Sequence, residues 1–86
     1  MKYRVLISRQ AEKSYEKLEE NVKVRVRKTL TDLEDQPYLG KRLHGELKEN
    51  YSIRLGKIRI VYTVSERDKT VYVIAIGWRK TIYRTR

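Results

Sequence analysis

The sequence predicts an α+β domain in which an N-terminal strand and a two-helix hairpin precede a three-stranded antiparallel sheet. Three patterns carry this prediction. Apolar and polar residues alternate in residues 3–7, 51–55 and 58–64, as in half-buried strands. Apolar residues recur at spacings of three and four between residues 9 and 33, as on the buried face of a helix. A Gly-Lys pair at 56–57 separates two of the strands, which indicates a two-residue hairpin turn.

The helical pair follows directly on the first strand. Ser8 ends that strand and is suited to cap a helix over about residues 9–20. Asn21 is expected to cap a second helix, which ends before Pro37. The apolar faces comprise Ala11, Tyr15 and Leu18 in the first helix and Val22, Val26, Leu30 and Leu33 in the second.

The second half of the chain supplies the sheet. Residues 36–50 contain the only proline and two glycines, and are predicted to form a loop ahead of the hairpin. Residues 71–76 are apolar at every position, which is typical of a strand covered on both faces, so we expect this strand at the centre of the sheet. A basic tail with aromatic residues spans 78–84. With 86 residues, the chain has room for one domain, residues 1–86.

The hairpin turn sets the register of its two strands and brings two arginines together. Arg54 and Arg59 then lie opposite each other on the face away from the helices. Like charges in this position destabilise a sheet. A bound anion would offset the repulsion, and phosphate matches the guanidinium fork; the alternative is that both side chains extend into water. Counting outward from the turn, the expected pairs are Leu55 and Ile58, Arg54 and Arg59, Ile53 and Ile60, Ser52 and Val61, and Tyr51 and Tyr62.

The net charge of +10 is concentrated in the second half of the chain. Residues 1–35 hold nine Lys and Arg against seven Asp and Glu, whereas residues 36–86 hold twelve against four. The excess therefore falls on the segment that carries the arginine pair, which is typical of a protein that binds a polyanion. The alternative is a generally basic protein without a nucleic-acid partner.

The sequence has few of the side chains that metal and cofactor chemistry needs. The chain has no cysteine and one histidine, His44, in the predicted loop, and the few carboxylates of the second half fall in loops and turns. We therefore expect neither a metal site nor a cofactor. Its apolar runs are too short for a signal peptide or a membrane span, so we expect a cytoplasmic protein with no membrane partner.

Arginine, lysine and tyrosine remain, and this set is sufficient to cleave RNA. The 2′-hydroxyl of RNA is the nucleophile, so a protein has to align it and stabilise the charge on the phosphoryl oxygens. Tyr83 lies in sequence among Arg79, Lys80 and Arg84, and positive charge lowers the pKa of a tyrosine toward the range of proton transfer. The alternative for Tyr83 is an ordinary aromatic contact of the tail. Trp78 is suited to stack on a base or to cover the core beside Gly77.

Three segments then stand in a recognisable order: residues 43–47, residues 51–62 and residues 74–83, the last ending in Gly77-x-Arg79-x-x-x-Tyr83. Together they resemble the RelE/ParE superfamily of type II toxin–antitoxin toxins, and its RelE-like branch in particular. The resemblance covers essentially the whole chain. It implies a RelE-like microbial RNase fold and a cognate antitoxin that wraps the toxin.

The resemblance also implies an activity and its residues. A RelE-like toxin is a ribosome-dependent, metal-independent endoribonuclease, which cleaves mRNA in the ribosomal A site by 2′-hydroxyl attack and so inhibits translation. Arg59 and Arg79 fall on the family's phosphate and transition-state arginines, Tyr83 on its C-terminal tyrosine, and Arg54 on a basic hairpin position. The residues expected to bind RNA are Lys41, Arg42, Lys48, Lys57, Trp78, Lys80 and Arg84.

Two positions depart from the RelE pattern. Ser52 stands where well-known members carry a second basic residue, which leaves the general acid unassigned; Lys48, Lys57 and Lys80 are candidates to replace part of the missing charge. Trp78 stands where many relatives carry histidine. Two alternatives stay open: a ParE-like toxin that binds DNA gyrase and has no nuclease activity, and a non-catalytic RNA-binding module.

Overall fold

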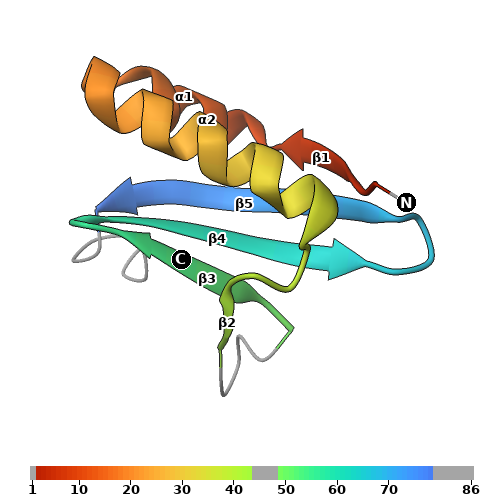
Figure 1. Cartoon of the computed structure of the whole chain (residues 1–86). Helices are drawn as coiled ribbons and strands as arrows, with labels where there is room; N and C mark the ends of the chain where they lie inside the picture. Colours follow the sequence, from red (N-terminus) through yellow and green to blue (C-terminus); the bar gives the residue numbers. More distant parts are fainter. Residues whose placement is uncertain (1, 44–48, 79–86) are drawn as a thin grey trace.

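Two helices lie on one face of a five-stranded sheet in the computed structural model, which describes residues 2–43 and 49–78 (Figure 1). The strand order is β1-β5-β4-β3-β2, with β1 parallel to β5 and the other neighbours antiparallel. The predicted α+β class is thus confirmed, although the sheet has one more strand than expected. The elements are β1 (Arg4–Ile7), α1 (Arg9–Glu16), α2 (Glu20–Asp35), β2 (Lys41–Arg42), β3 (Tyr51–Leu55), β4 (Ile58–Ser65) and β5 (Thr70–Trp78).

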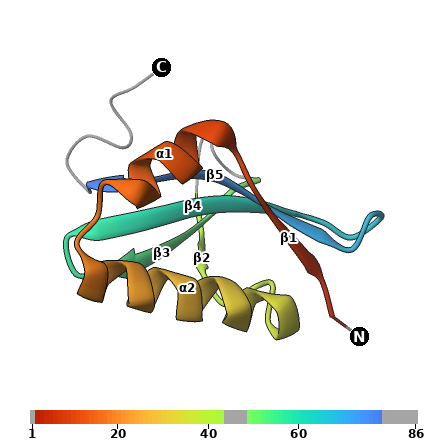
Figure 2. The same cartoon turned by 90° about the horizontal axis from the view of Figure 1, so that it is seen from above.

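Ser8 caps α1, as the sequence predicts. Its Oγ accepts a hydrogen bond from the backbone N–H of Ala11 at 3.0 Å and donates one to the carbonyl of Ile74 at 2.8 Å. The hydroxyl thereby satisfies one of the N–H groups at the start of α1 and also ties the helix to β5. Figure 2 shows α1 lying over β5 and α2 lying nearer to β3 and β4.

The boundary between the helices differs from the prediction. α1 ends at Glu16, and α2 starts after Glu19, whose carbonyl accepts hydrogen bonds from the N–H groups of Val22 and Lys23. Asn21 therefore lies inside α2, and its predicted capping role is wrong. An interruption at residues 17–19 lets Leu18 turn toward the core, where it packs with the apolar faces of both helices.

The predicted register of the β3–β4 hairpin is confirmed at all five pairs, including Arg54 opposite Arg59. Gly56 has a φ of +64°, a conformation that residues other than glycine adopt rarely and that a two-residue turn of this kind needs. Ile58, Ile60 and Tyr62 of β4 point toward the helices and are buried. The arginine pair consequently lies on the face that the helices leave uncovered.

The expectation that residues 71–76 form a central strand covered on both faces is wrong. β4 is the middle strand, and Tyr72 and Ile74 of β5 are 38 % and 39 % exposed. The register of β5 against β4 shifts between Val61 and Tyr62, which leaves Ile74 as an extra residue. Such a bulge shifts by one residue the alternation of side chains between the two faces of a strand. Val71 and Val73 before the bulge and Ile76 after it therefore all face the core. This shift hides the alternating pattern in the sequence, which is apolar at every position.

The short strand β2 lies within the segment that the sequence predicts as a loop. Two residues are too few to show a period of two, and β2 forms because tertiary contacts hold it against β3. The Tyr62 hydroxyl accepts a hydrogen bond from the N–H of Gly40 at 2.8 Å, and the Tyr51 ring stacks on that of Tyr62. The buried Tyr62 side chain thus holds in place the segment that leads into the edge strand β2.

Replacing Gly40 with alanine is expected to destabilise the fold. An added Cβ would lie 2.8 Å from the Tyr62 hydroxyl and 2.9 Å from the Ser52 carbonyl, which belongs to the backbone of β3. We expect Gly40→Ala to lower the free energy of unfolding by roughly 1–3 kcal/mol, measured by urea denaturation. Gly77→Ala is the matched control, because no atom of the described residues lies within 4 Å of its added Cβ; equal losses in the two variants would contradict the prediction.

Candidate functional site

The uncovered face of the sheet carries the arginine pair in the middle of a row that crosses three strands. Arg54 of β3 is the partner of Arg59 of β4, and Arg59 is in turn the partner of Gly77 of β5. Gly77 has no side chain, and among residues 2–43 and 49–78 no atom lies within 4 Å of the position that a Cβ would take there. The row can therefore present two guanidinium groups to one ligand.

The two arginines differ in their surroundings. Arg54 is exposed, whereas Arg59 is half-buried and its Nε is out of contact with solvent. The alternative in which both side chains extend into water applies to Arg54, whereas the Arg59 side chain is only partly in contact with water. A half-buried side chain has less conformational freedom to lose on binding a ligand than an exposed one.

A second row lies beside the first on the same face. It runs from Lys41 of β2 through Ser52 and Val61 to Ala75 of β5. Ser52 is only 7 % exposed, although it lies on the face that α1 and α2 leave uncovered. Lys41 is exposed, and its position opposite Ser52 adds a cation to this row.

Other predicted RNA-binding residues lie away from this face. Arg42 is the partner of Tyr51, and so belongs to the opposite face of the edge strand. Lys57 and Trp78 line a groove of about 480 Å³ on the helix side, with Leu18 and Ile76 on its apolar wall. Trp78 is 57 % exposed and pairs with Ile58. The structure therefore does not bring Arg42, Lys57 or Trp78 to the arginine pair.

The remaining predicted residues lie outside the part of the chain that the structure describes. They are Lys48, Arg79, Lys80, Tyr83 and Arg84, together with His44. Among residues 2–43 and 49–78, no group of three or more His, Asp or Glu side chains is placed to hold a metal ion. No helix in these ranges is long and apolar enough to cross a membrane.

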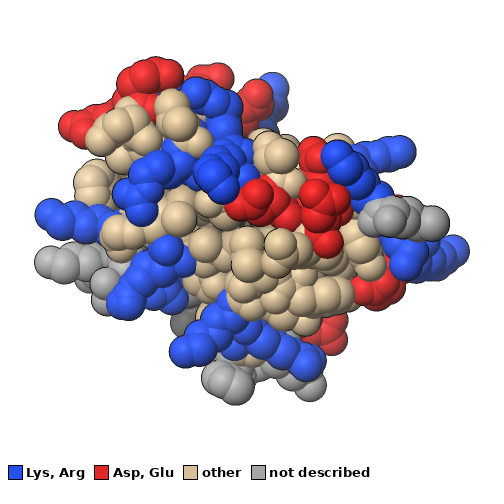
Figure 3. Space-filling view, viewed as in Figure 1, with Lys and Arg blue, Asp and Glu red and all other residues tan. Residues whose placement is uncertain are grey.

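Charged side chains of both signs are spread over the surface, and basic ones lie at both ends of the molecule in the view of Figure 3. In the view of Figure 3, basic side chains cover the left end, around the tip of the β3–β4 hairpin, and the lower edge over β2. Acidic side chains gather at the top left, over the ends of the helices, and at the upper right. The basic side chains around the hairpin tip and over β2 are suited to attract an anionic ligand.

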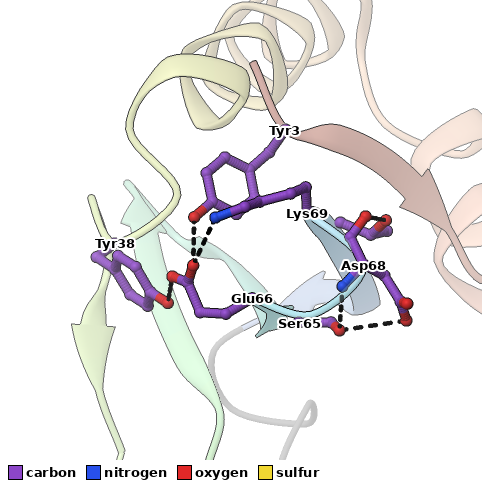
Figure 4. A network of polar contacts seen from close by, with 7 residues as sticks. Tyr3, Tyr38, Ser65, Glu66, Asp68 and Lys69 are labelled. Carbon is purple, nitrogen blue, oxygen red and sulfur yellow. Dashed lines mark hydrogen bonds and ion pairs between the residues drawn. The ribbon is translucent and has the colours of Figure 1, made fainter. Parts of the chain in front are cut away.

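The sequence analysis missed a polar cluster at the other end of the sheet (Figure 4). The Glu66 carboxylate accepts hydrogen bonds from the Tyr3 hydroxyl at 2.7 Å and from the Tyr38 hydroxyl, and it pairs with Lys69 at 3.2 Å. It thereby joins the N-terminal segment, the loop after α2 and the β4–β5 turn. The Tyr38 ring also contacts Tyr51 edge-on, so the cluster helps to hold the loop that leads to Lys41. Single polar residues so far apart in sequence give no pattern that predicts such a cluster.

The cluster shifts the pKa values of its members. Hydrogen bonds from Tyr38 and Tyr3, with a smaller effect of Lys69, lower the pKa of Glu66 to about 2. The hydrogen bond to Glu66 raises the pKa of Tyr38 to about 12. Both shifts favour the pair formed by an ionised carboxylate and a neutral phenol.

Comparison with known proteins identifies the class of protein. A family model described as the ParE toxin of type II toxin–antitoxin systems, parDE, matches residues 5–83. The chain therefore belongs to the ParE toxin family and is a toxin of the RelE/ParE superfamily, as the resemblance of its sequence implied. No match is found among curated proteins.

Solved structures of RelE toxins have the same fold. The toxin–antitoxin complex RelBE2 from Mycobacterium tuberculosis matches with a TM-score of 0.84 and 27 % identity, over 92 % of this chain and 100 % of that one. The isolated E. coli RelE toxin matches with a TM-score of 0.79 and 28 % identity, over 95 % and 92 %. The archaeal RelE–RelB complex from Pyrococcus horikoshii matches with a TM-score of 0.76 and 28 % identity, over 92 % and 97 %.

The Glu66 cluster predicts a specific pH dependence. Because the pKa of Glu66 is lower in the folded chain than its ordinary value of 4.5, its contribution to stability is present above pH 4.5 and is lost as the pH falls toward 2. Because the pKa of Tyr38 is raised from 10, its contribution is lost as the pH rises from 10 toward 12. In Glu66→Gln we expect the pKa of Tyr38 to return toward 10, measured by NMR titration of its ring.

Glu49→Gln is the control for this titration, because the Glu49 side chain is exposed and Glu49 does not belong to the Glu66 cluster. A Tyr38 pKa that is the same in Glu66→Gln and in the native chain would show that the carboxylate does not hold the phenol.

Proposed function

We propose that this toxin is an endoribonuclease that cleaves mRNA in the A site of the ribosome, and that a cognate antitoxin restrains it. The observation that carries the proposal is the row of Arg54 and Arg59 on the uncovered face of the sheet, with Gly77 as the partner of Arg59 in β5. The antitoxin is supported by the solved relatives, several of which are RelB–RelE complexes. Ribosomes and mRNA place this activity in the cytoplasm.

The proposed mechanism uses the arginines to stabilise the transition state. When the 2′-hydroxyl of RNA attacks the adjacent phosphorus, negative charge accumulates on the phosphoryl oxygens and the 5′-oxygen departs, which leaves a 2′,3′-cyclic phosphate and a 5′-hydroxyl. Arg59, half-buried and positioned, supplies donors to those oxygens without a change of its own protonation state. Arg54 is exposed and is suited to bind the neighbouring phosphate.

Arg79 and Tyr83 complete the proposed set. Arg79 follows Gly77 by two residues in the sequence, and Gly77 is the partner of Arg59 in the sheet. We propose Arg79 as a second donor to the phosphoryl oxygens and Tyr83 as the group that transfers a proton. Lys41 is an additional candidate for RNA binding, because it lies on the same face, opposite Ser52.

A second function is favoured by a different observation. The family model that matches this chain is that of the ParE toxin, and a ParE-like toxin would act on DNA gyrase without cleaving RNA. The same basic face would then contact a protein–DNA complex. A non-catalytic RNA-binding module is the third possibility, and its binding would be sensitive to salt but would yield no product.

Primer extension on mRNA from a translation reaction tests the nuclease proposal. We expect the native protein to produce stops within codons only when ribosomes are present. Arg59→Ala and Arg79→Ala are each expected to reduce cleavage by roughly 10²–10³-fold, as for the loss of one transition-state donor. Lys28→Ala is the control of equal charge, because Lys28 pairs with Asp32 on α2. Equal cleavage by Arg59→Ala and Lys28→Ala would reject the role of the arginine row.

A supercoiling assay separates the two toxin activities. If the protein is a ribonuclease, it should leave gyrase unaffected at concentrations that stop translation. Accumulation of gyrase–DNA cleavage complexes, with no stops in mRNA, would replace the nuclease proposal by the ParE-like one. Ribosome binding without either product would instead identify the non-catalytic module.

A further inference from the structure

The edge strand β2 brings Lys41 beside the arginine row. β2 lies at the edge of the sheet farthest from β1 (Figure 1), and Lys41 is the partner of Ser52 in β3. Ser52 precedes Arg54 by two residues, so Lys41 and Arg54 lie on the same face of the sheet. Residues placed diagonally across two strands in this way are about 7–8 Å apart. The exposed side chain of Lys41 is therefore long enough to reach a ligand that lies on the arginine row.

A residue of the core holds the segment that carries Lys41. The Tyr62 side chain is fully buried, and its hydroxyl accepts a hydrogen bond from the N–H of Gly40 at 2.8 Å. Gly40 fits so closely at this point that an added Cβ would lie 2.9 Å from the Ser52 carbonyl. β2 has only two residues, so it depends on such an anchor more than a longer strand would. Because Gly40 directly precedes Lys41, the Tyr62 hydroxyl fixes the point at which the chain enters β2.

The register of β2 decides which of two adjacent cations joins the arginine row. Arg42 follows Lys41 and is the partner of Tyr51, so it lies on the other face of the sheet. A shift of β2 by one residue would exchange the faces of the two cations. The hydrogen bond between Gly40 and Tyr62 opposes this shift, because it joins one particular backbone N–H to a side chain that the core holds in place. The core hydroxyl thereby selects Lys41.

We propose that Lys41 binds a second phosphate of the RNA strand on the arginine row, and that Tyr62 is the positioning residue that holds Lys41 there. This inference rests on the proposed binding of RNA to Arg54 and Arg59. Among the described residues, none of the ion pairs uses Lys41, and the ammonium group of a lysine binds phosphate as a point charge. Phosphates recur along an RNA strand, so a cation one row away from the arginine pair is suited to the phosphate next to the one at that pair.

Binding to a short single-stranded RNA with methylated 2′-hydroxyls tests the role of Lys41 separately from cleavage, because this RNA lacks the nucleophile. We expect Lys41→Ala to weaken binding by roughly 10-fold, as for the loss of one charged hydrogen bond. The slope of log K against log salt should fall by about 0.7, whereas Lys41→Arg should keep it. Arg42→Ala is the matched variant, because it removes the same charge from the other face of the same strand. Equal losses in Lys41→Ala and Arg42→Ala would overturn the inference, because net charge alone would then govern binding.

A double-mutant cycle tests the positioning role of Tyr62. Tyr62→Phe keeps the aromatic ring in the core and removes only the hydroxyl. We expect it to weaken RNA binding by roughly 2–10-fold in the native chain, because Lys41 then has more conformational freedom to lose on binding. In the Lys41→Ala background, the same change should leave binding unaltered. An equal loss in the two backgrounds would overturn the role of Tyr62, since a general structural effect does not require Lys41.

Hydrogen exchange keeps the test valid if Tyr62→Phe is less stable than the native chain. The Leu43 N–H donates to the Asn50 carbonyl at 2.9 Å, directly after β2. We expect the Leu43 amide to exchange faster in Tyr62→Phe, and the amide of Ile60 in β4 to keep its rate. Equal acceleration of both amides would overturn the anchoring of β2 by the hydroxyl.

The cleavage assay and the binding assay fail separately. A native protein that binds the methylated RNA but gives no stops in mRNA on ribosomes would refute the proposed nuclease, while the binding assay would still decide the role of Lys41. A native protein that does not bind this RNA would overturn the inference.

Discussion

The hydroxyl of Ser8 connects three parts of the fold at one point. It caps α1 and also donates to the carbonyl of Ile74, the extra residue of the bulge in β5. A bulge removes a residue from the ladder and leaves its backbone groups to be satisfied elsewhere. The end of β1, the start of α1 and the change of phase in β5 therefore depend on one another. Without this phase change, Ile76 and Val73 could not both face the helices, and the apolar layer that holds the domain together would be divided.

The second constraint is that the helices cover only one face of the sheet. The buried residues of β4 and β5 pack against Ala11, Val26 and Leu33, and the layer between them is the core. The other face is consequently available for charge, and a fold of this size has little apolar surface with which to cover it. The repulsion between Arg54 and Arg59 is tolerated because the opposite sides of the same two strands are buried in the core.

Much of this arrangement could be predicted from the sequence, and the failures have local physical causes. The register of the β3–β4 hairpin follows from the length of its turn, and the cap at Ser8 from its position before an apolar period. The bulge at Ile74 was missed, because a shift of phase inside an apolar run leaves no trace in the pattern. β2 and the Glu66 cluster depend on contacts between distant residues, such as Gly40 with Tyr62 and Tyr3 with Glu66. Within the site, the sequence correctly predicted the pairing of Arg54 with Arg59, but it could not place Trp78 and Lys57 on the helix side.

The turn at Gly56 and Lys57 makes the placement of Arg59 dependent on the number of residues in the turn. Side chains alternate between the faces of a strand. One residue inserted in the turn, with the pairing of β3 unchanged, would therefore have two possible outcomes for β4. In the first outcome, the core residues of β4 stay buried and the loop becomes one residue longer. In the second, the loop keeps its length and Arg59 turns into the core. The first outcome costs far less free energy, since burying an unpaired guanidinium is highly unfavourable. We therefore expect an insertion at this turn to lengthen the loop and to leave Arg54 paired with Arg59.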